Sequence, residues 1–197
     1  MKDALRAALA RYSPSTIDDE PRLARAAVLA LFYDAGGEPH LVFQRRSERV
    51  LHHKGQVSFP GGAMDPGDEH PQWTALRETH EEIGVAPEDV EVLGQLDELI
   101  TISGFRVTPF VGWLRAYPYP WRFSAEEVAY LLEVPFATLR DPKNYVPDVR
   151  TYEGRQVVLP SYRVGPDLIW GATARIVANL LDVCLTIPDL EPARGGA

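Results

Sequence analysis

The sequence predicts a domain of the α/β or α+β class built around a large mixed β-sheet. Two apolar, β-branched or aromatic runs, residues 25–34 and 39–46, are separated by the turn residues AGGE, which is typical of a hairpin. The same pattern returns at residues 90–99 and 106–115, which a short loop joins. Between residues 71 and 84 the periodicity becomes helical, and this change between strand and helix segments indicates layers of both kinds.

Three further helices are expected from the spacing of apolar residues. They cover residues 3–12, 124–134 and 172–185. The second would begin at Ser124, with Glu127 three residues later, which is the spacing of a capping box. A further hairpin is expected within residues 156–171, and Gly84 is placed to cap the helix over residues 71–83.

Length and composition favour one soluble domain. With 197 residues and 45% hydrophobic content, the chain can bury one core, which we place at residues 25–187, after an N-terminal helix and lead-in over 1–24 and before a tail over 188–197. A net charge of −8 argues against nucleic-acid binding, and no apolar run approaches the ~20 residues that span a bilayer. The single cysteine, Cys184, excludes an internal disulfide, fits a cytoplasmic protein and is expected to be buried.

Three carboxylates crowd the helix over residues 71–83. Glu78 and Glu82 are four residues apart and Glu78 and Glu81 three, and each like-charge pair destabilises an isolated helix by roughly 0.2–0.5 kcal/mol. A cation there would relieve this repulsion, and oxygen ligands without sulfur favour Mg²⁺ or Mn²⁺. The alternative is that these glutamates form a solvated helix face.

This helix is expected to bury one face and to expose the acidic one. Placing residues at intervals of about 100° divides its side chains into two sets. The expected core side consists of Trp73, Leu76, His80 and Ile83, and the expected acidic side of Arg77, Glu78, Glu81 and Glu82. Before the helix, Gly61 and Gly62 follow the apolar run VSF, and glycines there allow the backbone to approach a ligand or metal closely.

The stretch GGAMDPGDEHPQWTALRETHEEIGV resembles the Nudix box, in which a glycine and a glutamate precede R-E-U-x-E-E-x-G-U, with U an apolar residue. The second half of the box is matched by Arg77, Glu78, Glu81, Glu82, Gly84 and Val85. Two positions differ, because Ala63 stands where the box has glycine and Thr79 where it has an apolar residue. The loop from Gly62 is one residue longer than usual, so either Asp68 or Glu69 can fill the first acidic position.

The similarity spans roughly residues 25–185 and implies both a fold and an activity. The implied fold is an α/β/α sandwich around a mixed β-sheet, and the implied activity is metal-dependent hydrolysis of a nucleoside diphosphate linked to another moiety. The longer loop and the segment GQVSFPGG are similar to the coenzyme A diphosphatase branch, whose products are 3′,5′-ADP and 4′-phosphopantetheine. The alternatives are NADH, ADP-ribose or a dinucleoside polyphosphate as the substrate, or a non-catalytic nucleotide-binding module. A homodimer is left open.

The acidic helix and the resemblance together give roles to single residues. Glu78, Glu81 and Glu82 are expected to carry Mg²⁺ or Mn²⁺, and Arg77 to orient this acidic face. The general base is left open between Glu81 and Glu127, the latter having a capping role as its alternative.

A basic segment before the glycines is expected to bind substrate phosphates together with Gly61 and Gly62. An acidic protein needs local positive charge to hold a polyanion. RRSERVLHHKG supplies this charge through Arg45, Arg46, Arg49, His52, His53 and Lys54, with a solvated turn as the alternative. Gln44 and Leu51 replace the threonine and arginine of the coenzyme A branch. Trp170 and Tyr162 could stack on adenine, but we expect both in the core.

Overall fold

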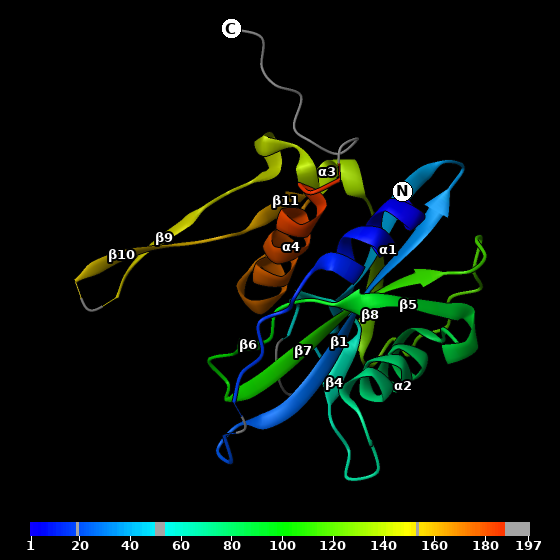
Figure 1. Ribbon diagram of the computed structural model, residues 1–197, viewed down its shortest axis with the longest axis horizontal. Helices are drawn as coiled ribbons and strands as arrows, with labels where there is room; N and C mark the ends of the chain where they lie inside the picture. Colours follow the sequence, from blue (N-terminus) through cyan, green and yellow to red (C-terminus); the bar gives the residue numbers. More distant parts are fainter. Residues whose placement is uncertain (19, 50–53, 153, 188–197) are drawn as a thin grey trace, which may run out of the picture.

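A computed structural model describes residues 1–18, 20–49, 54–152 and 154–187 (Figure 1). Its centre is a mixed sheet of eight strands. These are β1 Ala24–Ala35, β2 Glu38–Arg46, β3 Val57–Ser58, β4 Gly61–Ala63, β5 Val90–Gln95, β6 Leu99–Ile100, β7 Phe105–Leu114 and β8 Val128–Pro135. The strand order is β3-β2-β1-β7-β5, with β4 paired to β1, β6 to β7 and β8 to β2.

The sheet is mixed because β1 has neighbours of both directions. β1 and β2 form the predicted hairpin, in which Leu31 lies opposite Val42. On its other edge β1 runs parallel to β7, beginning with Ala24 opposite Phe105. β5 pairs antiparallel with β7, so the second predicted pair of strands is also confirmed.

The strands β1 and β2 part beyond their hairpin, and this divergence shapes the site described below. β1 pairs with β2 over Leu31–Ala35, whereas its earlier residues Ala26–Val28 pair with β4. β2 continues instead alongside β3. The chain between β3 and β4 therefore bridges two diverging strands. This bridging chain lies close to β1, because a Cβ added to Gly61 would lie 2.3 Å from the Ala27 carbonyl oxygen. The φ of Gly61, 149°, also favours glycine at this position.

Helices cover both faces of the sheet, which gives the predicted three-layer arrangement (Figure 1). The helices are α1 Lys2–Arg11, α2 Pro71–Ile83, α3 Phe136–Arg140 and α4 Gly171–Cys184, with single 3-10 turns η1 at Pro87–Asp89 and η2 at Pro142–Asn144. One buried cluster joins α1, α3 and α4 to one face, and a second joins α2 to the other. No helix among the described residues is long and apolar enough to cross a membrane.

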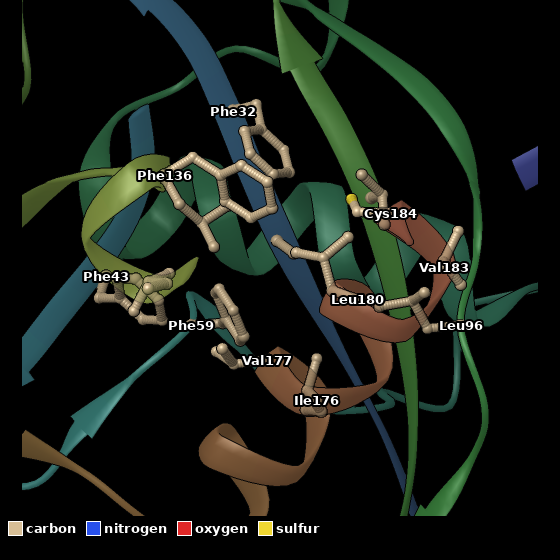
Figure 2. Packing of buried hydrophobic residues seen from close by; sticks show 14 of the residues in the cluster. Phe32, Phe43, Phe59, Leu96, Phe136, Ile176, Val177, Leu180, Val183 and Cys184 are labelled. Atoms are coloured by element: carbon tan, nitrogen blue, oxygen red, sulfur yellow. The ribbon is translucent and has the colours of Figure 1, made fainter. Parts of the chain in front are cut away.

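The α4 side holds the larger core (Figure 2). Val177 lies beside Phe59, and Leu180 points from α4 toward Phe136 of α3. Within that aromatic group, the Phe32 and Phe136 rings meet edge to face at 5.2 Å between centroids. Burial of Cys184 among these groups raises the pKa of its thiol to about 12, so the prediction of a packing role is confirmed.

Local signals fix both ends of α2. His70 adopts an extended conformation and its Nδ1 accepts a hydrogen bond from the Gln72 N–H at 3.1 Å, while Pro71 occupies the first helical turn. At the other end Gly84 takes a left-handed conformation with φ 76° and donates its N–H to the His80 carbonyl. The predicted bounds of this helix are therefore confirmed.

The predicted inner face of α2 is partly wrong. Trp73 is 61% exposed and His80 is exposed, whereas Ala75, Thr79 and Glu82 are buried. Small side chains at Ala75 and Thr79 let the helix lie close to β1 and β4, and the Thr79 hydroxyl is satisfied by the Ala75 carbonyl at 2.6 Å. Hydrophobicity alone favoured the bulkier residues and placed a buried glutamate on the outside.

The predicted helix over residues 124–134 is wrong. Ser124 starts only a single turn, in which its carbonyl accepts from the N–H of Val128 at 2.9 Å, and β8 follows. β8 pairs antiparallel with β2, with Leu41 opposite Val134. The burial of Leu132 and Val134 on either side of an exposed Glu133 is the alternation of a strand, and the free edge of β2 supplies its hydrogen bonds.

The C-terminal part contains two small hairpins rather than one. β9 Asp148–Tyr152 and β10 Arg155–Leu159 form an arm that projects from the body (Figure 1). β11 Tyr162–Val164 and β12 Asp167–Ile169 form the second hairpin, inside the predicted 156–171 range. The helix expected over 172–185 is α4 and the one expected over 3–12 is α1, both confirmed within a residue. The expected tail over 188–197 lies outside the described residues.

Candidate active site

Arg77 on α2 connects the carboxylates of the acidic cluster. Its Nη1 donates to Glu78 at 2.8 Å and to Glu81 at 3.0 Å. Its Nη2 donates to Asp68 at 3.0 Å and to the Ala63 carbonyl at 3.2 Å. This single guanidinium therefore ties the helix to the loop that precedes it, and the orienting role expected for Arg77 stays a prediction.

Asp68, rather than Glu69, is the loop carboxylate that contacts Arg77. Asp68 also accepts hydrogen bonds from the Thr74 hydroxyl at 2.9 Å and from the Asp65 N–H at 3.0 Å, whereas Glu69 is exposed. The Arg77 guanidinium holds the pKa of Asp68 down at about 2. These contacts favour Asp68 for the first acidic position, which stays a prediction.

Glu78 lies directly against the glycine loop. A Cβ on Gly62 would lie 2.5 Å from the Glu78 carboxyl carbon, so only glycine leaves room for this carboxylate. Burial raises the pKa of Glu78, and its hydrogen bond with Arg77 acts in the opposite direction. Gly62 thus has a steric reason to lack a side chain beside the acidic cluster.

Glu82 is the buried member of the cluster. Its Oε2 accepts from the Gly61 N–H at 2.9 Å and from Gln44 Nε2 at 2.7 Å, and its Oε1 lies 3.5 Å from Arg46 Nη1. Burial raises the pKa of Glu82 to about 7 despite these contacts. The Glu82 carboxylate therefore lies at the bridge between the diverging strands, where the bridging chain supplies a backbone N–H and β2 supplies two side chains.

The two candidate bases lie in different surroundings. Glu81 is 56% exposed and bonded to Arg77, within the acidic cluster. Glu127 is exposed in the turn before β8, where its backbone carbonyl accepts from the Ser47 N–H at 2.8 Å. The described contacts therefore join Glu81 to the cluster, and join Glu127 to Ser47 after β2 and to Ser124 in its own turn.

The basic segment divides between the two faces of β2. Arg46 lies beside Glu82, whereas Arg45 Nη1 forms an ion pair of 2.6 Å with the buried Asp167 of β12. Arg49 and Lys54 are exposed in the following loop. His52 and His53 lie outside the described residues.

A cavity of about 790 Å³ opens next to this cluster. Its wall includes Arg46 and Gly61, and it also includes Trp170, the first turn of α4 and Arg175. Trp170 is 43% exposed, so the core expectation is wrong for this residue, whereas Tyr162 is buried as expected. Sequence reasoning missed Arg175 and the contact of Gln44 with Glu82, because both depend on long-range packing.

The oxygen donors of the cluster suit a hard divalent cation. The carboxylates of Glu78, Glu81 and Glu82 offer oxygen alone, and Gln44 Oε1 is a buried oxygen with no hydrogen-bond partner among the described residues. The glycine at position 62 leaves the cradle beside Glu78 open. Over the described residues, no group of three His, Cys, Asp or Glu side chains is arranged to hold a metal ion, and these glutamates form ion pairs with Arg46 and Arg77.

Comparison with known proteins identifies the family. The NUDIX domain matches residues 23–150. A protein of Pectobacterium atrosepticum named "Uncharacterized Nudix hydrolase NudL" is 42% identical over 146 residues, covering 72% of this chain and 73% of that protein. A protein of the same name from Yersinia enterocolitica is 43% identical over 145 residues, covering 73% of each.

Solved structures with low sequence identity share the fold. The crystal structure of a Nudix hydrolase from M. smegmatis, RenU, matches with a TM-score of 0.57 at 23% identity, covering 85% of this chain and 88% of that one. A MutT/nudix family protein from Enterococcus faecalis matches with a TM-score of 0.55 at 14% identity, covering 94% of this chain and 70% of that one. By its domain match and its relatives, the chain belongs to the NUDIX domain family and is a hydrolase of diphosphate bonds in nucleoside diphosphate derivatives.

Proposed function

We propose that this protein hydrolyses the diphosphate bond of coenzyme A, with Mg²⁺ or Mn²⁺, to 3′,5′-ADP and 4′-phosphopantetheine. The observation that supports this proposal most directly is the position of Glu82. This buried carboxylate accepts a hydrogen bond from the Gly61 N–H, and Gly61 lies in the wall of the cavity of about 790 Å³. A cavity of this size lies in the range that encloses a cofactor-sized ligand, about 300–1,000 Å³. The loop length and GQVSFPGG favour coenzyme A through the resemblance described above.

Each residue near the bond has a distinct task in this proposal. Glu78, Glu81 and Glu82 hold the divalent cation, which neutralises phosphate charge and lowers the pKa of water when bound. Arg77 keeps Glu78 and Glu81 oriented through its two hydrogen bonds from Nη1. Arg46 binds a substrate phosphate, since it is a cationic residue of the cavity wall and lies beside Glu82.

Bond cleavage requires one water and one proton acceptor. The water oxygen bonds to one phosphorus as the bridging oxygen leaves with the other, so each product carries a terminal phosphate. Glu81 is our first candidate to accept the proton of the water, because it is the most accessible carboxylate of the cluster. Glu127 is the second candidate, in the turn beside the loop after β2. Gly61, Gly62, Arg49 and Lys54 remain proposed phosphate contacts, and Arg45 contributes by fixing β2 through Asp167.

The test is to incubate the protein with Mg²⁺ or Mn²⁺ and, separately, with coenzyme A, NADH and ADP-ribose, and to identify the products by mass. Preferential formation of 3′,5′-ADP from coenzyme A supports the proposal, and preference for another nucleotide replaces the substrate while retaining the chemistry. Glu82→Gln should lower kcat/KM by about 10²–10³-fold. Glu38→Gln, an exposed carboxylate on β2, serves as the control. Normal turnover by Glu82→Gln would refute the assigned cation site.

The other class of function is a nucleotide-binding module without catalysis. Retention of all three cluster carboxylates and their connection by Arg77 favour the enzyme. Binding of all three nucleotides without any product would support the module instead. We place the activity in the cytoplasm, since the single cysteine forms no internal disulfide.

A further inference from the structure

The cavity carries positive charge in an acidic protein. Its wall contains three arginines, Arg46, Arg150 and Arg175, against one carboxylate, Asp148, which is a formal charge of +2 in a chain of net charge −8. A positively charged wall attracts anions. The apolar residues in the rest of the wall favour a ligand that also has an uncharged part.

The three arginines differ in how much of their hydrogen-bonding capacity is already used. Arg46 lies 3.5 Å from Glu82, and Arg150 Nε forms an ion pair of 2.7 Å with Asp148. Arg175 donates from Nη1 to the Ile100 carbonyl at 3.2 Å, and within the described part of the chain no carboxylate pairs with it. A guanidinium has five N–H donors, so Arg175 is fixed in position by one bond and keeps several donors for a ligand.

Trp170 supplies an aromatic surface in the same cavity. It is the residue before α4 and lies five positions before Arg175, and it is 43% exposed. No aromatic ring of the described residues stacks on it, in contrast to Phe32 and Tyr33 in the core. An exposed indole in a cavity wall is suited to stacking on a nucleobase.

We propose that Arg175 and Trp170 form a subsite that selects a nucleotide carrying a phosphomonoester in addition to its diphosphate. Trp170 stacks on the base, and Arg175 binds the separate phosphate through charge-assisted hydrogen bonds. The cluster around Glu82 and Arg46 receives the diphosphate at the Gly61 end of the same cavity. This inference rests on the proposed function, since coenzyme A has such a phosphate on its ribose, and it assigns the recognition of that phosphate to one arginine.

The kinetic test compares coenzyme A with dephospho-coenzyme A, which lacks only the separate phosphate. The wild type should show a higher kcat/KM for coenzyme A. Arg175→Ala should lower kcat/KM for coenzyme A by about 10- to 100-fold, mainly through KM, and leave that for dephospho-coenzyme A unchanged. Trp170→Ala should lower kcat/KM for both substrates by about 10-fold, because both substrates carry adenine. Arg11→Ala, an exposed arginine at the end of α1 and outside the cavity wall, is the charge-matched control.

A binding measurement separates failure of this subsite from failure of the proposed function. Calorimetry with 3′,5′-ADP and 5′-AMP measures the contribution of the separate phosphate without any turnover. Tighter binding of 3′,5′-ADP by the wild type, lost in Arg175→Ala and retained in Arg11→Ala, supports the subsite even if coenzyme A is not hydrolysed. Equal affinity of the wild type for the two nucleotides would overturn the proposed subsite. So would an equal loss of kcat/KM for coenzyme A and dephospho-coenzyme A in Arg175→Ala.

Discussion

The contact between Asp68 and Arg77 predicts a pH-dependent contribution to stability. Arg77 donates to both carboxylate oxygens of Asp68, with donor–acceptor distances of 3.0 and 3.4 Å. The amide of Asp68→Asn has one acceptor oxygen and no negative charge, so it cannot accept both of these charge-assisted bonds. The pKa of Asp68 is lowered from 3.8 to about 2. At about 1.4 kcal/mol per pKa unit this corresponds to roughly 2 kcal/mol, and partial exposure of Arg77 reduces the expected loss to about 1–2 kcal/mol.

The sign of the pH dependence follows from the lowered pKa. A carboxyl with a lower pKa in the folded state stabilises the fold above its unfolded pKa, and this stabilisation disappears as pH falls through the folded value. The difference in unfolding free energy between wild type and Asp68→Asn should therefore be full at pH 7 and shrink as pH falls from about 4 toward 2.

Urea unfolding at several pH values measures this difference directly. At pH 7 the expected loss corresponds to a fall in Tm of about 2–8 °C for a chain of this length. Glu69→Gln is the matched control, since Glu69 is the exposed neighbour, and its effect should stay within about 0.5 kcal/mol. A larger loss in Glu69→Gln than in Asp68→Asn, or a difference that does not change with pH, would refute the assignment of Asp68 as the partner of Arg77.

Two further predictions concern the glycine loop and β2. Gly62→Ala should lower kcat by about 10- to 100-fold, because its Cβ would displace the Glu78 carboxyl carbon 2.5 Å away, whereas Gly67→Ala, with open space around it, should leave kcat unchanged in the same assay. Arg46→Ala should mainly raise KM, whereas Arg45→Ala should mainly lower stability, by about 1–3 kcal/mol, because it leaves the buried β12 carboxylate without its ion pair. Paired steady-state kinetics and urea unfolding separate the two arginines, and a raised KM in Arg45→Ala with unchanged stability would contradict this division.

The sequence predicted the elements whose signals are local. The hairpin of β1 and β2 followed from two β-rich runs around AGGE, and α2 from its periodicity together with Gly84. The prediction of a helix over residues 124–134 was wrong because Ser124 and Glu127 are compatible with both a helix start and a single turn. The open edge of β2 decided between them, and its residues pair with β8 across 82 to 95 positions of the chain, from Arg46 with Val128 to His40 with Pro135.

The same reasoning explains which parts of the site were predictable. Glu78, Glu81 and Arg77 are joined by contacts within α2, and the spacing of four residues between Arg77 and Glu81 is sufficient to predict that these two side chains are neighbours. The burial of Glu82 was not predictable, because it depends on Gln44, which lies 38 residues earlier. Trp170 also misled the sequence reasoning, since hydrophobicity does not reveal that its surroundings form a cavity wall.

The divergence of β1 and β2 explains why Glu82 can be buried on α2 and still belong to the site. Because the strands part, the bridging chain presents the Gly61 N–H to the α2 face while Gly61 also lines the cavity that α4 bounds on the other face. A continuous sheet would separate these two sides with paired backbone. The Glu82 carboxylate on the α2 side and the proposed nucleotide subsite on the α4 side can therefore meet where the sheet is interrupted, so the interruption would position the proposed reaction.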